Sequence, residues 1–213
     1  MHLSMHLSEA SPPLIEYGSQ FHRRGWALGT SGNFSVVLGR TPLRLAITAS
    51  GVDKGRLSTE QVVEVDNVGR ILSGSGKASA ETLLHLQVVR STGADAVFHT
   101  HSVWSTILSD FHCAERGFTI EGYEMLKGLE GVTTHEHREW IPILSNTQNM
   151  VRLSSDIETL LAERPSTHGL LIHRHGLYTW GRDAAAAARH VEILEFLLES
   201  VGRSYTLRAG GQQ

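Results

Sequence analysis

Two histidines stand two residues apart behind a short apolar run, in the segment AVFHTHSVW (residues 96–104). In an extended strand, residues i and i+2 face the same side, so His99 and His101 would project together while Thr100 faces away between them. Neutral imidazoles are common ligands of divalent metal ions. The segment therefore predicts half of a metal site, which a third ligand from elsewhere in the chain must complete.

The segment GLLIHRHG (residues 169–176) offers His173 and His175 at the end of a second apolar run, where a glycine allows a sharp turn. Three imidazoles leave a fourth coordination position for water or substrate, as in catalytic zinc sites. Such an ion would polarise a carbonyl and stabilise the enediolate that forms when a neighbouring proton leaves. The chain has 13 histidines, so ordinary hydrogen-bonded histidines are the competing interpretation.

A second histidine pair, His135 and His137, lies in the charged segment THEHREW. No apolar run precedes this pair, so the pattern that marks a buried strand end is missing. We therefore rank it well below the first pair as a metal candidate.

Three loops carry glycines, hydroxyl groups and backbone amides that suit a phosphate. GTSGNFSV (residues 29–36) lies between an expected helix and an expected strand, where glycines let N–H groups turn toward an anion. TASGV (48–52) and SGSGKASAE (73–81) add further hydroxyl groups, with Lys77 as a candidate cation. Any one of these loops could be an ordinary turn, but the three together favour a phosphate site.

Two carboxylates are candidates for acid/base chemistry. Glu81 stands in the first turn of an expected helix, where its alternative role is to favour the helix N-terminus electrostatically. Glu124 lies among apolar residues and glycines in GYEMLKG, where partial burial would raise its pKa toward a useful range. Its alternative role is that of a solvated helix residue.

Helical and strand patterns alternate along the chain. We expect helices at residues 8–24, 79–92 with Ser79 as cap, from 103 onward, 121–129, 147–164 and 183–203. We expect strands at residues 33–38, 43–48, 61–72 as a pair around a turn, 96–102, 140–144 and 167–176. Early β-hairpins among helices predict an α/β sandwich with a largely antiparallel or mixed sheet.

The bulk composition fits a single domain over residues 1–213, with loose ends at 1–9 and 206–213. The formal net charge of −3 argues against nucleic-acid binding. One cysteine, Cys113, excludes an intramolecular disulfide, and neither a secretory signal nor a membrane-length apolar run is present. We expect a cytoplasmic protein that acts on a small molecule, without nucleic-acid or membrane partners.

The motifs TSGNFS, TASGV, SAE, HTHS and RHG resemble the class II aldolase and adducin-head family over residues 10–203. The resemblance implies a three-layer αβα sandwich and a homotetramer with active sites at subunit contacts. It implies one Zn²⁺ per subunit held by His99, His101 and His175, without His173. A sugar-phosphate substrate is also implied, with its phosphate bound by residues of the three loops: Asn33, Ser50, Gly51 and Ser79. Ala80 departs from the pattern, because the aldolases have a second hydroxyl residue there.

Within the family, HTHS, EMLKG and LIHRHGLYTWG are most similar to the members that eliminate water from a ketose phosphate. The aldolases have a tyrosine where this chain has Glu124, and a carboxylic acid can protonate a departing hydroxyl. Glu81 could be a metal ligand, an acid/base group or neither, because related dehydratases can carry cysteine there. Two alternatives remain open, namely a sugar-phosphate aldolase or 4-epimerase and a non-enzymatic interaction module like the adducin head.

Overall fold

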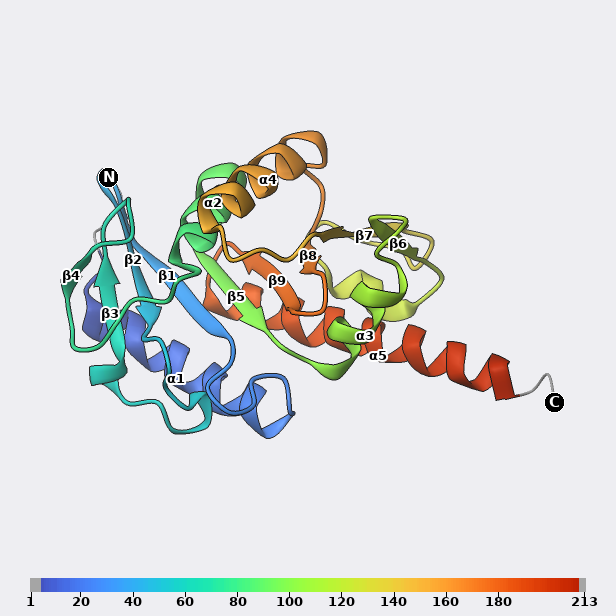
Figure 1. Cartoon of the computed structure of the whole chain (residues 1–213), viewed down its shortest axis with the longest axis horizontal. Helices are drawn as coiled ribbons and strands as arrows, with labels where there is room; N and C mark the ends of the chain where they lie inside the picture. Colours follow the sequence, from blue (N-terminus) through green and yellow to red (C-terminus); the bar gives the residue numbers. More distant parts are fainter. Residues whose placement is uncertain (1–4, 211–213) are drawn as a thin grey trace.

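The computed structural model describes residues 5–210 and contains a nine-stranded sheet in the order β4-β3-β2-β1-β5-β9-β8-β7-β6 (Figure 1). Neighbouring strands are antiparallel except β7 and β8, which are parallel. The strands are β1 (Asn33–Arg40), β2 (Leu43–Thr48), β3 (Val62–Val65), β4 (Ile71–Ser73), β5 (Ala96–Thr100), β6 (Gly117–Ile120), β7 (Glu139–Leu144), β8 (Gly169–Ile172) and β9 (Gly176–Gly181).

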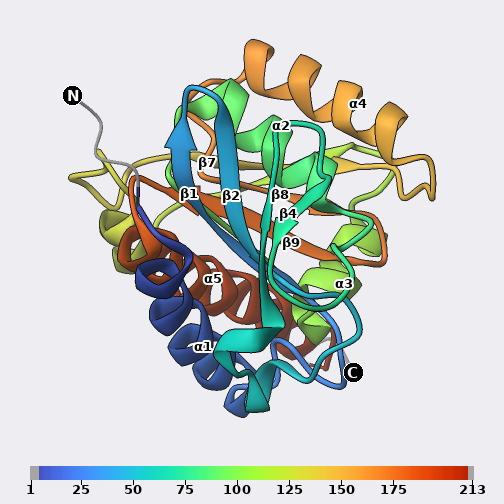
Figure 2. The ribbon, with the colours of Figure 1, turned by 90° about the vertical axis from the view of Figure 1, so that its left-hand side faces the viewer.

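Helices cover both faces of the sheet. They are α1 (Leu7–Arg23), α2 (Thr82–Thr92), α3 (Val103–Phe111), α4 (Met150–Glu163) and α5 (Ala184–Gly210), with short 3₁₀ helices η1 (Lys54–Arg56), η2 (Thr59–Gln61) and η3 (Glu124–Gly128). Figure 2 shows α1 and α5 on one face and α2 and α4 on the other. The mixed three-layer αβα sandwich expected from the sequence is confirmed.

Strand alternation divides the core between the two faces. Val36 packs in the cluster with α1 and α5, whereas its neighbour Val37 packs with α2 and α4. On β5, Phe98 faces α1 and α5 and Val97 faces α2 and α4. Because β5 lies between β1 and β9, its residues are buried from Ala96 to Thr100.

The structure corrects several sequence-based expectations. Strands β6 and β9 were not expected, and Glu81 rather than Ser79 is the N-cap of α2. The ends are less loose than expected, because residues 7–9 begin α1 and residues 206–210 end α5. The remainder of the two ends, 1–4 and 211–213, lies outside the described residues. Between residues 5 and 210, no helix has the length and apolar character that crossing a bilayer requires.

Candidate active site

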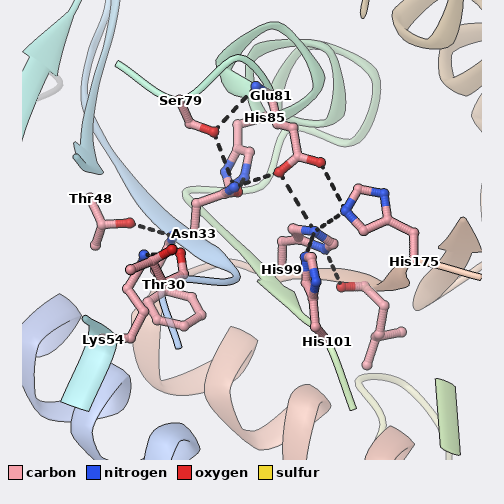
Figure 3. Close-up of polar contacts among 12 residues, drawn as sticks. Thr30, Asn33, Thr48, Lys54, Ser79, Glu81, His85, His99, His101 and His175 are labelled. Atoms are coloured by element: carbon pink, nitrogen blue, oxygen red, sulfur yellow. Dashed lines mark hydrogen bonds and ion pairs between the residues drawn. The ribbon is translucent and has the colours of Figure 1, made fainter. Parts of the chain in front are cut away.

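Three imidazoles converge where β5 ends beside the turn between β8 and β9 (Figure 3). The Nε2 atom of His99 lies 2.7 Å from His101 Nε2 and 3.4 Å from His175 Nε2. His99 is the last residue but one of the buried strand β5, and His101 follows two residues later on the same side, as alternation predicts. The predicted trio is therefore brought together.

The turn that carries His175 depends on a glycine. A Cβ atom at Gly176 would lie 2.0 Å from the carbonyl oxygen of Thr100, so only glycine lets the start of β9 approach β5 this closely. His173 lies in the same turn but faces outward, with Nε2 3.0 Å from Asp110 Oδ1. In an extended strand, His173 and His175 would share a face. They do not, because both belong to a turn rather than to an extended strand.

His99 and His101 are neutral near neutral pH, as metal ligands need to be. Burial and the neighbouring imidazoles His101 and His175 lower the pKa of His99, and burial with the charges of His175 and Lys54 lowers the pKa of His101 to about 4. His99 Nδ1 donates to the carbonyl oxygen of Leu177 at 2.9 Å, which leaves its Nε2 unprotonated. The Nε2 atoms of His101 and His175 both lie near this lone pair, so the three nitrogens are placed to ligate one divalent metal ion.

Glu81 lies beside the three histidines, at the N-cap of α2. Its Oε1 atom is 3.2 Å from His175 Nε2, and its Oε2 atom is 3.6 Å from His99 Nε2. Oε2 also accepts a hydrogen bond of 2.6 Å from Asn33 Nδ2. This second contact orients the carboxylate, which lies close enough to ligate an ion or to exchange a proton with a bound molecule.

A pocket of about 390 Å³ opens beside the cluster. It is lined by the four predicted phosphate residues, Asn33, Ser50, Gly51 and Ser79, together with Glu81, His101 and His175. Each of the three loops singled out in the sequence therefore contributes to one cavity. Lys77 is exposed and does not line it.

The cation in this pocket is Lys54, which sequence reasoning missed. Its side chain is buried, with Nζ donating to the carbonyl oxygens of Val52 at 2.9 Å and Thr30 at 3.2 Å. Burial lowers the pKa of Lys54 to about 8, partly opposed by the charges of Asp53 and Glu81. The available signal was its position three residues after Gly51, in the loop TASGVDKG.

A second missed residue, His85, fixes the orientation of Asn33. His85 Nε2 donates to Asn33 Oδ1, and Nδ1 lies 2.7 Å from the Ser35 hydroxyl. Burial lowers the pKa of His85 to about 3, so the ring is neutral. With its carbonyl oxygen engaged by His85, Asn33 directs its amide group to Glu81 and to Ser79 Oγ at 3.2 Å.

Thr100, between His99 and His101, points its side chain to the opposite face, as expected. Thr100 Oγ1 donates to Glu195 Oε1 at 2.7 Å, which connects the end of β5 to α5. Glu195 is 2% exposed, and its burial raises its pKa to about 7.

Glu124 does not lie in this pocket. It begins η3 with 72% of its side chain exposed, and its Oε1 accepts from Lys127 Nζ at 2.5 Å. The expectation that burial raises its pKa is wrong, because the hydrogen bond and charge of Lys127 lower it. Only Leu126 of the apolar residues in η3 is buried, so the neighbours of Glu124 in the sequence do not shield it.

Comparisons with known proteins agree with the geometry. The model of the Class II Aldolase and Adducin N-terminal domain matches residues 13–201, so the chain belongs to this family. A protein of Sorangium cellulosum named methylthioribulose-1-phosphate dehydratase is 45% identical, covering 90% of this chain and 91% of the relative. A protein of the same name from Methylococcus capsulatus is 44% identical, covering 92% of this chain and 94% of its own length.

Among solved structures, L-fuculose-1-phosphate aldolase from Thermus thermophilus has the same fold, with a TM-score of 0.74. Its sequence is 24% identical, and the match covers 96% of this chain and 99% of that one.

Proposed function

We propose that this chain is a metal-dependent lyase that removes water from 5-methylthioribulose 1-phosphate, giving 2,3-diketo-5-methylthiopentyl 1-phosphate in methionine salvage. The observation that carries the proposal is the full-length similarity to proteins named for this dehydration, in a chain with three converging histidines beside a polar pocket. We assign the reaction to the cytoplasm, because the single Cys113 requires no oxidising compartment.

His99, His101 and His175 would hold one divalent ion per subunit, and we propose zinc. Such an ion, when bound, would stabilise negative charge on those substrate oxygen atoms that lie next to the reacting carbon. Three features support this ligand set: the facing Nε2 atoms, the lowered pKa values of His99 and His101, and the Leu177 carbonyl that fixes the His99 tautomer.

The polar end of the pocket would bind the phosphate. Ser50 and Ser79 offer hydroxyl donors, and Gly51 offers a backbone amide in an open turn. Asn33 lines the same end of the pocket and would contact the phosphate by exchanging its present hydrogen bond to Ser79 Oγ for one to the ligand. Lys54 adds a positive charge below a pH of about 8. Binding energy from a phosphate remote from the reacting carbons can orient those carbons for reaction.

The elimination itself needs a base and an acid. The C3 proton leaves, the C4 hydroxyl leaves as water after protonation, and the resulting enol becomes the C3 ketone by proton transfer to C4. Glu81 lies beside the histidines and is our candidate for the groups that act near C3. We assign protonation of the C4 hydroxyl, and the later proton transfer, to Glu124.

Glu124 would act on the pocket of another subunit. Its side chain is exposed and does not line the pocket of its own chain, so it can contact a substrate only in the pocket of a second copy. We therefore propose a homotetramer in which each active site forms at a contact between subunits. This arrangement makes Glu124 and the histidine cluster separable in an experiment.

The test incubates the metal-loaded protein with 5-methylthioribulose 1-phosphate and follows the diketone. We expect the diketone to form and no aldehyde fragment to be released. Release of an aldehyde would identify an aldolase instead, and absence of any turnover would contradict the enzymatic proposal. Mixing Glu124→Gln chains with His101→Gln chains should give more activity than either variant has alone, because some mixed contacts contain both intact residues. If mixing never raises activity although hybrids form, the shared site is wrong.

A further inference from the structure

A second cluster of possible metal ligands lies where β7 and β8 begin. Glu139 begins β7, His168 immediately precedes β8, and His137 precedes β7 by two residues. Because β7 and β8 are parallel, both strands begin on the same side of the sheet, whereas His175 follows the end of β8. The two clusters are therefore on separate parts of the fold.

Both histidines of this cluster contact the same carboxylate oxygen of Glu139. Glu139 Oε2 lies 2.7 Å from His137 Nε2 and 3.0 Å from His168 Nδ1. Only 2% of the Glu139 side chain is exposed, so its negative charge is largely withdrawn from solvent. A buried carboxylate is costly unless a positive charge lies against it.

The hydrogen bonds of His168 show where that positive charge is needed. His168 Nε2 lies 2.8 Å from the carbonyl oxygen of Glu130, which can only accept, so Nε2 carries a proton. In the neutral ring, Nδ1 then directs a lone pair at Glu139 Oε2. The two atoms attract only if a cation lies between them, either a proton or a metal ion. The tautomer is fixed by a backbone carbonyl, as at metal-bound histidines.

Neighbouring groups leave the site accessible. A cavity of about 570 Å³ is lined by His137, His168, Glu130, Arg182 and His190. Arg182 pairs with the Glu130 carboxylate at 3.2 Å, and His190 uses both nitrogens on the Trp180 carbonyl and the Glu130 amide. Neither is directed at Glu139 Oε2, and the cavity leaves room for water to complete a coordination sphere.

We propose that His137, Glu139 and His168 form a second divalent-metal site, distinct from the histidine trio of the proposed active site. Two imidazoles and one carboxylate suit a first-row transition ion such as zinc. The ion would fasten the loop after η3 to the starts of β7 and β8. This inference goes beyond the proposed function and does not depend on it.

The ligand spacing requires only a small adjustment. Two ligands bound tetrahedrally at about 2.1 Å from zinc are roughly 3.4 Å apart. The observed separations of 2.7 and 3.0 Å would widen by about half an ångström at this spacing. His137 can move, because it is 30% exposed and lies in a loop.

The first experiment counts zinc bound per chain by equilibrium dialysis and elemental analysis. We expect two ions in the unmodified protein and one in His137→Gln, with His168→Gln as the second variant. The matched control is His135→Gln, which removes an exposed histidine from the same loop and should still bind two. His101→Gln should bind one, because it removes only the other site.

A second measurement guards against variants that fold poorly. In the His101→Gln background, added zinc should raise the midpoint of thermal unfolding, since a ligand of the folded state stabilises it. Adding His137→Gln should abolish that increase. The proposal is overturned if the zinc counts of His137→Gln and His168→Gln equal that of the unmodified protein, which would mean that Glu139 holds only protons. If His101→Gln is the only one of these variants that still binds as much zinc per chain as the unmodified protein, the proposed metal site of the histidine trio is wrong instead.

Discussion

Replacing Glu195 by glutamine should change how stability depends on pH. Burial raises the pKa of Glu195 from its usual 4.5 to about 7, while hydrogen bonds from Ser102 and Thr100 partly oppose this increase. Between these pH values the folded protein keeps a proton that the unfolded chain has lost. The contribution of the Glu195 proton to the stability of the folded protein is therefore complete below pH 4.5 and is lost as the pH rises through 7.

The gap between 4.5 and about 7 corresponds to about 3 kcal/mol, at about 1.4 kcal/mol for each tenfold change in proton affinity. Glutamine keeps an oxygen that can accept from Thr100 and carries no charge at any pH. The free energy of unfolding of Glu195→Gln, relative to the unmodified protein, should therefore rise by up to about 3 kcal/mol from acid to alkaline pH.

Urea unfolding from about pH 4.5 to 8.5, at one protein concentration, measures this difference. The matched control is Glu199→Gln, one turn further along α5, whose carboxylate is 41% exposed and pairs with Arg203. We expect the control to change stability by less than about 1 kcal/mol at every pH. If Glu195→Gln and the unmodified protein show parallel pH profiles, Glu195 is ionised in the folded state and the reasoning is wrong.

Three further predictions concern the proposed reaction. Glu124→Gln should keep its bound metal and lose about 100-fold in turnover, measured by diketone formation; a near-normal rate would remove Glu124 from the mechanism. Lys54→Met should raise KM more than it lowers kcat, and a KM equal to that of the unmodified protein would exclude a phosphate contact. The KM of the unmodified protein should also rise above pH 8 as Lys54 loses its proton. His85→Leu should raise KM and lower stability by about 1–3 kcal/mol in urea unfolding, because Asn33 loses a buried partner; unchanged KM would show that Asn33 needs no such support.

The sequence predicted best where a local rule determines the outcome. The alternation of β5 predicts that His99 and His101 face one side and Thr100 the other, and this is observed. The helices were found from their apolar spacing and from breakers such as Gly93, which ends α2 in the left-handed conformation. Glycine-rich loops also pointed correctly to the residues that line the pocket.

Features decided by long-range contacts could not be predicted in the same way. Strand β9 is six residues long with glycine at both ends, a pattern that resembles a loop until β5 and β8 pair with it. Lys54 is directed by two backbone carbonyls, which no side-chain pattern reveals. The exposure of Glu124 depends on how η3 packs against the rest of the fold, and its apolar neighbours in the sequence suggested the opposite.

The three-histidine metal site can be tested by a crystal structure of the active, zinc-loaded protein, with data collected on both sides of the zinc absorption edge. We expect an anomalous peak about 2.0–2.1 Å from the Nε2 atoms of His99, His101 and His175. Active protein with no metal among these three rings would contradict it.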